Sequence, residues 1–209
     1  KERFSQRFGA AIKSGGRSDS LKKILFAELT LDANALRHYV KTVFSELIVR
    51  ESENGEWWKT VWVEGSDFAS VRAEPDVARD IYNVVSHWFR VKGLCVDREV
   101  RASGGSIDML VTGAANSEIS RCGVEVKFAH HQNVIHGVSH QLPDYMDDLR
   151  AEAGIYMVIW CKGDKFSKPT NYASMEELAD ELKRNVPKEK RIDVVSVNAS
   201  YRPAPSKRI

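Results

Sequence analysis

Apolar residues recur along this chain with two periods, and the switch between the periods separates helices from strands. Spacings of three and four residues predict helices, whereas alternation or short apolar runs bounded by turn residues predict strands. The expected helices cover residues 21–31, 34–49, 74–91, 133–152 and 174–184. The expected strands cover residues 94–101, 106–112, 123–128, 155–161 and 191–197. From residue 74 onward this order predicts an α/β fold whose mixed sheet is covered by helices on both faces.

Composition divides the rest of the chain. Residues 1–20 are polar and rich in Gly and Ser, so we expect a linker or flexible segment there. Residues 21–72 are expected to form an N-terminal helical and hairpin extension, and residues 73–200 the core. Residues 201–209, with two prolines, are expected to be a disordered tail. Because the chain begins at Lys1 rather than at a methionine, we expect it to belong to a longer protein with other domains.

Three tryptophans lie close together within the expected extension. Asn54-Gly55 is a turn signal beside Trp57, Trp58 and Trp62, and this pattern predicts a hairpin. The tryptophans favour packing of this segment onto the core. The alternative is an aromatic platform on which nucleic-acid bases stack.

Composition and charge exclude several classes of protein. With 43% hydrophobic and 29% charged residues in 209, the chain has an ordinary soluble globular composition. No apolar run approaches the length of a membrane span, and we expect a cytoplasmic protein without membrane contact. Its three cysteines lie in predicted buried strands without CxxC spacing, which favours reduced core residues over disulfides or zinc ligands. A net charge of +2 permits nucleic-acid binding but does not argue for it.

The candidate chemistry lies inside two predicted strands. Residues two apart in a strand point to the same face, so Glu125 and Lys127 project side by side from an apolar segment. A carboxylate in such a segment costs free energy unless it is paired or binds a cation. Taken alone, Glu125 fits an ion pair with Lys127, and Asp108 fits an aspartate that bonds a turn amide. Together the two acids favour a divalent metal, Mg²⁺ or Mn²⁺, held by hard oxygen ligands.

These residues resemble the motifs of the PD-(D/E)xK nuclease superfamily, and the resemblance covers roughly residues 74–198. The first motif is Ser106-Ile107-Asp108, which lacks the conventional proline before the acid. The second is Glu125-Val126-Lys127, and Gln141 with Tyr145 follows at the QxxxY spacing of RecB-like branches. The resemblance implies a restriction-endonuclease-like αβββαβ core.

The resemblance also implies roles for these residues. Asp108, Glu125 and the backbone carbonyl of Val126 would bind the metal, which lowers the pKa of bound water and neutralises phosphate oxygens. Lys127 would orient or polarise the attacking water and offset charge on the phosphorus. Gln141 and Tyr145 would position the lysine or contact the DNA strand. In-line hydrolysis would leave a 5′-phosphate and a 3′-hydroxyl.

Two helical positions modify this picture. Pro143 lies between Gln141 and Tyr145 and would kink an established helix, so a helix that starts near Leu142 would break the face these residues share. Glu74, at the start of the 74–91 helix, falls on the buried arc and is a candidate accessory metal ligand. It fits equally a solvated acid that complements the helix N-terminus.

Polar residues around the predicted hairpin at 94–112 are candidates for substrate binding. Arg98, Arg101, Ser103 and Gly104 could hold a phosphate backbone at the mouth of the site, or the charges could form an ordinary solvated face. Histidines at positions 130, 131, 136 and 140 suggest zinc. Without cysteine partners at ligand spacing, they favour surface or phosphate-contacting roles.

Taken together, the sequence predicts a Mg²⁺- or Mn²⁺-dependent nuclease that hydrolyses DNA. It would be an effector module of a larger prokaryotic restriction, repair or anti-phage defence protein, a context that rests on fold-level analogy. Two alternatives stay open: a catalytically inactive nuclease fold that binds DNA or protein, and an RNA-directed nuclease. Double-strand cutting usually needs two sites, as in a homodimer, and nicking needs one.

Overall fold

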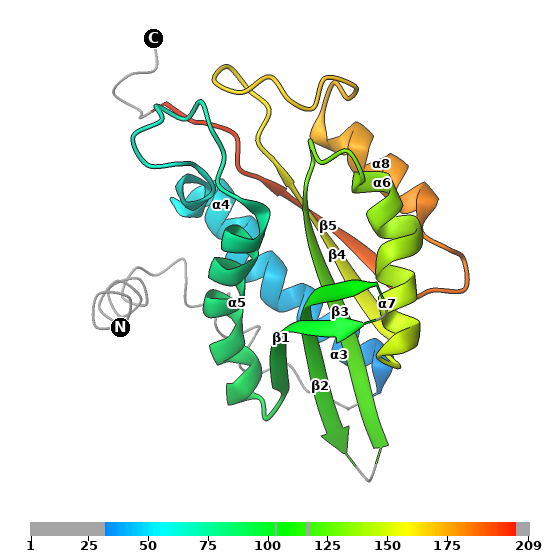
Figure 1. Ribbon diagram of the computed structural model, residues 1–209. Coiled ribbons are helices and arrows are strands. Elements are labelled where there is room, and N and C mark those ends of the chain that lie inside the picture. The colour runs from blue at the N-terminus through cyan, green and yellow to red at the C-terminus, as the bar shows by residue number, and fades with distance from the viewer. Residues whose placement is uncertain (1–31, 103, 116–117, 204–209) are drawn as a thin grey trace.

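A five-stranded mixed sheet forms the centre of the molecule (Figure 1). The computed structural model describes residues 32–102, 104–115 and 118–203. The strands are β1 Cys95–Ala102, β2 Gly105–Ala115, β3 Glu118–Phe128, β4 Ala153–Trp160 and β5 Ile192–Asn198. They lie in the order β1-β2-β3-β4-β5, with β1, β2 and β3 antiparallel and β3, β4 and β5 parallel. The predicted α/β class and the αβββαβ order of a restriction-endonuclease-like core are confirmed.

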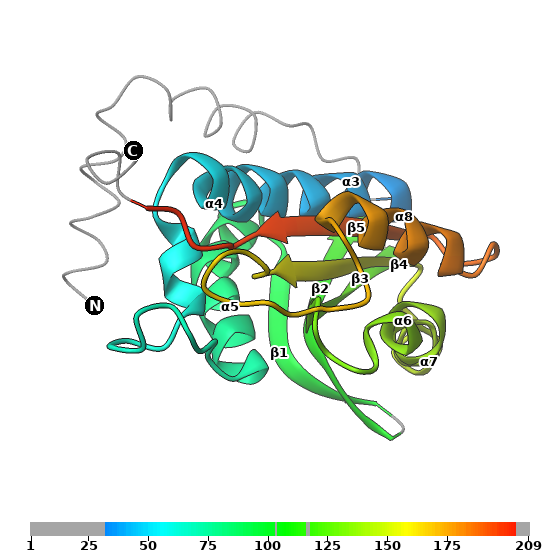
Figure 2. The ribbon, with the colours of Figure 1, turned by 90° about the horizontal axis from the view of Figure 1, so that it is seen from above.

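Helices cover both faces of this sheet (Figure 2). The α-helices are α3 Ala33–Phe44, α4 Arg50–Asn54, α5 Glu74–Val91, α6 Val134–His136, α7 Leu142–Asp148 and α8 Met175–Asn185. π-helical turns η1 Ser45–Val49 and η3 Gly137–Gln141 join α3 to α4 and α6 to α7, and η2 Trp57–Val61 is a 3₁₀ helix. The helices α3 and α5, with the turn η1, share one apolar cluster with the sheet, and α6, α7 and α8 share another. The first cluster runs continuously across the expected boundary between residues 72 and 73.

The α5 helix is set by strong signals at both ends. Proline in its first turn and the acids Glu74 and Asp76 favour the helix start. At the other end Gly93 adopts a φ of +74°, and the Gly93 and Leu94 amides donate to the carbonyls of Arg90 and Phe89. This double hydrogen bond is a Schellman motif, for which glycine is the favoured residue. The fixed register of α5 brings Glu74 to the end of β3.

The predicted hairpin at Asn54-Gly55 is wrong. Helix α4 continues to Asn54, the tryptophans beyond it begin η2, and only an isolated bridge joins Trp62 to Val71. Trp58 and Trp62 are 5% and 4% exposed, so neither offers an open face on which a base could stack. The indole of Trp62 donates to the carbonyl of Ala199, 3.0 Å away. The packing interpretation of these two tryptophans is therefore the right one.

The chain ends and the cysteines bring further results. Tyr201, in the expected disordered tail, packs its ring 4.8 Å from that of Phe68, so order extends into the tail. Residues 204–209, the expected 1–20 linker and the 21–31 helix lie outside the described residues. Cys122 and Cys161 are buried as predicted, but Cys95 is exposed because β1 is an edge strand. None of the helices in the described part of the chain has the length and apolar character that crossing a bilayer requires.

Candidate functional site

The site lies in a fork between β2 and β3. The register of these strands ends at Met109 opposite Val124, and beyond that point β3 continues beside β4. Asp108 replaces the missing ladder contact, because its Oδ2 accepts a hydrogen bond of 2.7 Å from the amide of Val126. The N–H and C=O of one strand residue point to the same side. The carbonyl of Val126 therefore also faces the fork, where the sequence predicted a metal ligand.

A strained residue lies directly opposite Asp108 in β1. Glu99 has a φ of +53°, which is left-handed and uncommon for a residue with a side chain. It reverses the alternation of β1: Val96 packs into the apolar cluster on the α5 side, whereas Val100 packs against the cluster on the α7 side. The tip of the β1–β2 hairpin thereby turns over α7 and leaves the fork open. The sequence contained no signal for this, because glutamate rarely adopts this conformation.

Replacing Glu99 with glycine is expected to stabilise the protein by about 0.5–1 kcal/mol, because glycine adopts a positive φ without strain. The loss of the 3.1 Å ion pair between Arg98 and Glu99 offsets little of this, since both side chains are partly exposed. Urea unfolding of Glu99→Gly beside Glu99→Ala measures the effect. Alanine removes the same ion pair but keeps the strain, so equal stability of the two variants would contradict the assignment.

Three charged side chains meet at the end of β3. Lys127 Nζ lies 2.9 Å from Glu125 Oε1 and 3.0 Å from Glu74 Oε1. The second oxygen of Glu74 accepts from the amide of Phe128 at 2.9 Å. Glu125 is 2% exposed and Lys127 9% exposed, so this cluster is largely removed from water. The structure thus brings Glu74 into the site, but as a partner of the lysine.

Gln141, the last residue of η3, and Tyr145 of α7 join this cluster. The side-chain amide of Gln141 donates to Glu125 Oε1 at 2.9 Å and to the Tyr145 hydroxyl at 3.3 Å. Helix α7 does begin at Leu142, but the π-helical turn η3 leads into it continuously, and Pro143 occupies its first turn. The wider π-helical turn before it accommodates a residue that has no amide to donate. The face shared by Gln141 and Tyr145 is kept, contrary to the break that Pro143 suggested.

Gly105 is a residue of this site that the sequence did not single out for it. A Cβ atom at position 105 would overlap the hydroxyl of Tyr145. The backbone of the hairpin therefore packs directly on the tyrosine that contacts Gln141. From the sequence, Gly105 was expected only to allow the tight Ser-Gly-Gly turn.

Gly105→Ala is expected to displace Tyr145 and loosen Gln141 from Glu125, which lowers any activity of the site about tenfold, because small misplacements at a reacting centre are costly. The matched control is Gly163→Ala, whose new methyl group meets only an ordinary contact with Ser200. Steady-state cleavage rates of both variants measure the difference. Unchanged activity in Gly105→Ala would show that Tyr145 does not support the site.

Burial dominates the electrostatics of the two central acids. Desolvation raises the pKa of Asp108 to about 6, although the Val126 amide and Lys127 act against it. Desolvation, followed by the charge of Asp108, raises the pKa of Glu125 to about 8 and outweighs the attraction of Lys127. Burial alone would lower the pKa of Lys127, but Glu125 and Glu74 together raise it above its usual value. The site therefore carries two acids whose negative charges repel each other, and the positive charge of Lys127 does not compensate for their burial.

One oxygen of this site has no partner. Glu125 Oε2 is buried and makes no hydrogen bond to any described residue. A buried carboxylate oxygen without a partner is costly, and a cation beside Asp108 would satisfy it.

The donors fit a hard divalent cation. In the described ranges, no three or more His, Cys, Asp or Glu side chains are grouped to hold a metal by themselves. Mg²⁺ usually keeps several waters and takes only one or two protein carboxylates together with substrate phosphates. Asp108, Glu125 and the carbonyl of Val126 supply such a set.

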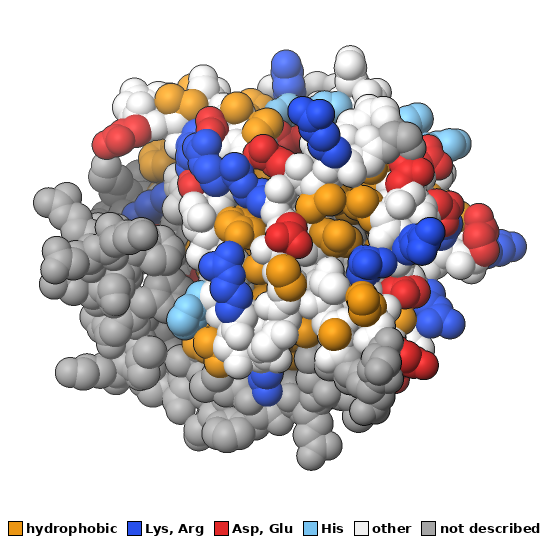
Figure 3. Space-filling view, turned by 60° about the horizontal axis from the view of Figure 1, so that its bottom comes forward, with side chains coloured by type: hydrophobic (Ala, Val, Ile, Leu, Met, Phe, Trp, Pro, Cys, Tyr) orange, Lys and Arg blue, Asp and Glu red, His pale blue; other side chains and the backbone are white. Residues whose placement is uncertain are grey.

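The predicted substrate-binding residues lie on the hairpin, beside the fork. Arg98 pairs with Glu99, Arg101 is exposed, and Gly104 forms the turn with a φ of +84°. Ser103 lies outside the described residues. On the face shown in Figure 3, described side chains of both charges are interspersed rather than gathered into one basic surface.

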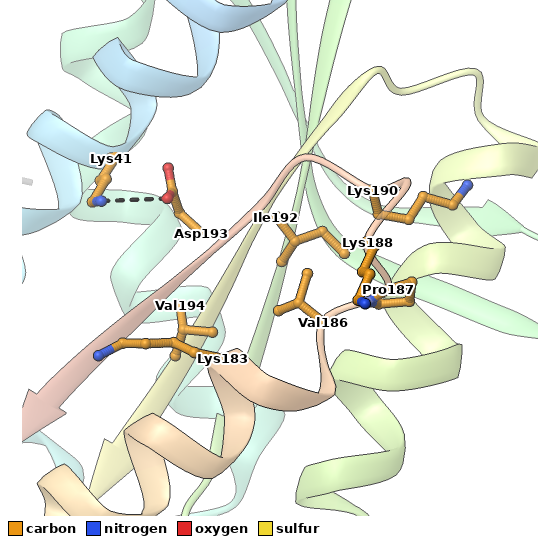
Figure 4. Close-up of a pocket in the computed structure, with 9 residues that line it drawn as sticks. All are labelled: Lys41, Lys183, Val186, Pro187, Lys188, Lys190, Ile192, Asp193 and Val194. Atoms are coloured by element: carbon orange, nitrogen blue, oxygen red, sulfur yellow. Dashed lines mark hydrogen bonds and ion pairs between the residues drawn. The ribbon is translucent and has the colours of Figure 1, made fainter.

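A separate hollow lies between α3, α8 and β5. It has a volume of about 320 Å³ and is lined by Lys41, Lys183, Val186, Pro187, Lys188, Lys190, Ile192, Asp193 and Val194. The lysines do not converge in it: Lys41 reaches Asp193, whereas Lys183 and Lys190 point away to opposite sides (Figure 4). It lacks the carboxylate and lysine arrangement of the fork.

Comparison with known proteins places this fork in a recognised domain. A model of the family described as a domain of unknown function, DUF8371, matches residues 38–163. The chain belongs to the DUF8371 family. Comparison with curated proteins and with solved structures gave no match. The DUF8371 match runs from within α3 to just beyond β4, so it contains every described residue of the site and ends before α8 and β5.

Proposed function

We propose that this protein is a metal-dependent nuclease that hydrolyses phosphodiester bonds of DNA. The observation that carries the proposal is the partnerless Oε2 of buried Glu125, held in a fork between Asp108 and Lys127. An apolar strand tolerates such an oxygen when a cation completes its surroundings. The resemblance to PD-(D/E)xK nucleases in these same residues, and the αβββαβ order around them, support this chemistry.

Each residue has a distinct part in the proposed reaction. Asp108, Glu125 and the Val126 carbonyl would hold Mg²⁺ or Mn²⁺, and a bound cation of this kind lowers the pKa of water and neutralises phosphate oxygens. Lys127 would place its ammonium group against the phosphate as negative charge develops there. Gln141 holds Glu125 in place from the end of η3, and Glu74 holds Lys127 from α5.

The alternative functions differ in which of the site residues they would require. An inactive nuclease fold that binds DNA or protein would have no need for Asp108, Glu125 and Lys127 to meet, and the convergence of all three favours an enzyme. An RNA-directed nuclease would use the same residues. Assignment to a prokaryotic restriction, repair or defence protein in the cytoplasm, as part of a longer chain or a homodimer, follows from the same resemblance.

End-labelled DNA and RNA of one sequence, incubated with Mn²⁺, test the proposal and separate these alternatives. We expect cleavage of DNA, with 5′-phosphate and 3′-hydroxyl ends on the products. Cleavage of RNA alone would replace DNA with RNA as the substrate. Tight binding of DNA without cleavage of either polymer would favour the inactive binding module.

A further inference from the structure

The loop between β4 and α8 carries three lysines, of which one pairs with no residue in the described part of the chain. Lys162 donates to the carbonyl of Tyr172 at 2.5 Å, and Lys165 pairs with Asp67 at 2.6 Å. Lys168 is exposed and makes no ion pair with any described residue. Two lysines of this loop are thus held in place by described residues, and among these residues the third has no ion-pair partner.

Aromatic contacts connect this loop to the fork. The ring of His130 stacks on that of Phe128, with centroids 5.1 Å apart and planes 27° apart. The ring of Phe166, two residues before Lys168, also contacts the His130 ring, edge to face, with centroids 5.1 Å apart. Phe128 directly follows Lys127 and donates its amide to Glu74. His130 therefore links the loop to the end of β3, the strand that carries the site.

The charges around His130 agree with this position. Burial and then the positive charge of Lys168 lower the pKa of His130, whereas Glu74 acts in the opposite direction. Its Nδ1 is buried and has no hydrogen-bond partner among the described residues. The charges of Lys168 and Glu74 are thus both close enough to His130 to affect its pKa.

A second cation lies on the hairpin side of the fork. Arg101 is exposed near the hairpin tip, which turns over α7 and packs Gly105 on Tyr145. The β4–α8 loop leaves the sheet beyond the ends of β3 and β4, whereas the hairpin tip lies beside α7 (Figure 1). A polyanionic strand laid across the fork would meet positive charge from both the hairpin and the loop.

We propose that Lys168, with His130 beside it, binds a backbone phosphate of the nucleic-acid strand whose neighbouring phosphodiester lies in the fork. The inference rests on the proposed function. Phosphate contacts of this kind position a strand without reading its sequence. Lys168 therefore sets affinity and strand path, while chemistry stays with the residues of the fork.

Fluorescence anisotropy of a labelled DNA duplex, with Ca²⁺ in place of Mn²⁺ to prevent cleavage, tests this contact. Lys168→Ala is expected to raise Kd about three- to tenfold at every sequence and to reduce the salt slope by about one. Lys168→Glu should raise Kd further, because it adds repulsion. Lys165→Ala is the matched control from the same loop and should leave Kd unchanged.

The outcomes separate this inference from the proposed function. Equal Kd values for wild type and Lys168→Ala would overturn the phosphate contact and leave a nuclease in place. Equal weakening by Lys168→Ala and Lys165→Ala would also overturn it, since the effect would then be one of general charge. A wild-type protein that neither binds nor cleaves DNA would overturn the proposed function itself.

Discussion

Lys127→Ala is expected to reduce Mn²⁺-dependent DNA cleavage at least 10²- to 10³-fold, because it removes the ammonium group that, in the proposed reaction, would offset charge on the phosphate. Lys127 also neutralises Glu125 and Glu74, at 2.9 and 3.0 Å. Its loss destabilises the fold, and breaking a buried ion pair typically costs about 3–5 kcal/mol. Single-turnover cleavage measured below the melting temperature of the variant separates the chemical loss from unfolding.

Two further variants make the result specific. Lys183→Ala removes a lysine that pairs with Asp180 on the exposed side of α8, and it should cleave at the wild-type rate. Lys127→Arg keeps a charge for Glu125 and Glu74, and it should restore stability more fully than activity, because the guanidinium is larger and planar. A folded Lys127→Ala variant that cleaves within threefold of wild type would remove Lys127 from the mechanism.

Glu125→Gln is expected to make the metal-free protein more stable at pH 8 by about 2 kcal/mol, and to abolish its stabilisation by Mn²⁺. The pKa of Glu125 rises from 4.5 to about 8 on folding. The native state therefore binds more protons than the unfolded chain throughout that window, so the free energy of unfolding falls as the pH rises through it. Above pH 6 this term comes mainly from Glu125, because the pKa of Asp108 is about 6.

Urea unfolding in EDTA at pH 6, 7 and 8 measures the slope. Wild type should lose stability across this range relative to Glu125→Gln, whereas Glu118→Gln, an exposed acid of the same strand, should follow wild type. Saturating Mn²⁺ should restore about 3 kcal/mol to wild type at a concentration 100-fold above Kd, and little to Glu125→Gln. If the free energy of unfolding changed with pH equally in wild type and Glu125→Gln, burial of this acid would not destabilise the protein, and the account would be contradicted.

The sequence predicted the parts of the site that depend on local periodicity. Glu125 and Lys127 share a strand face because side chains alternate, and this holds in any sheet that contains the segment. Glu74 could be placed on the buried arc of its helix in the same way. The partner of Glu74 could not be predicted, because its contact with Lys127 depends on where the start of α5 lies relative to β3.

The rest depended on the meeting of distant segments. The left-handed Glu99, the fork it opens at Asp108 and the packing of Gly105 on Tyr145 join β1, β2 and α7, and no local pattern encodes that arrangement. Pro143 pointed to a break between Gln141 and Tyr145, but a π-helical turn before it accommodated the proline. Asn54-Gly55 pointed to a hairpin, yet the apolar stripe of the preceding helix continued into η1, and the helical path ran on through α4 to Asn54.

Cleavage of supercoiled plasmid by the purified protein, with Mn²⁺ or with EDTA, tests the central claim most directly. Wild type should convert supercoiled DNA to nicked or linear forms in Mn²⁺ and leave it intact in EDTA. Lys127→Ala should leave it intact in both. Intact plasmid with the folded wild-type protein, together with no heat of Mn²⁺ binding in calorimetry, would contradict the assignment of Asp108 and Glu125 to a metal-dependent nuclease.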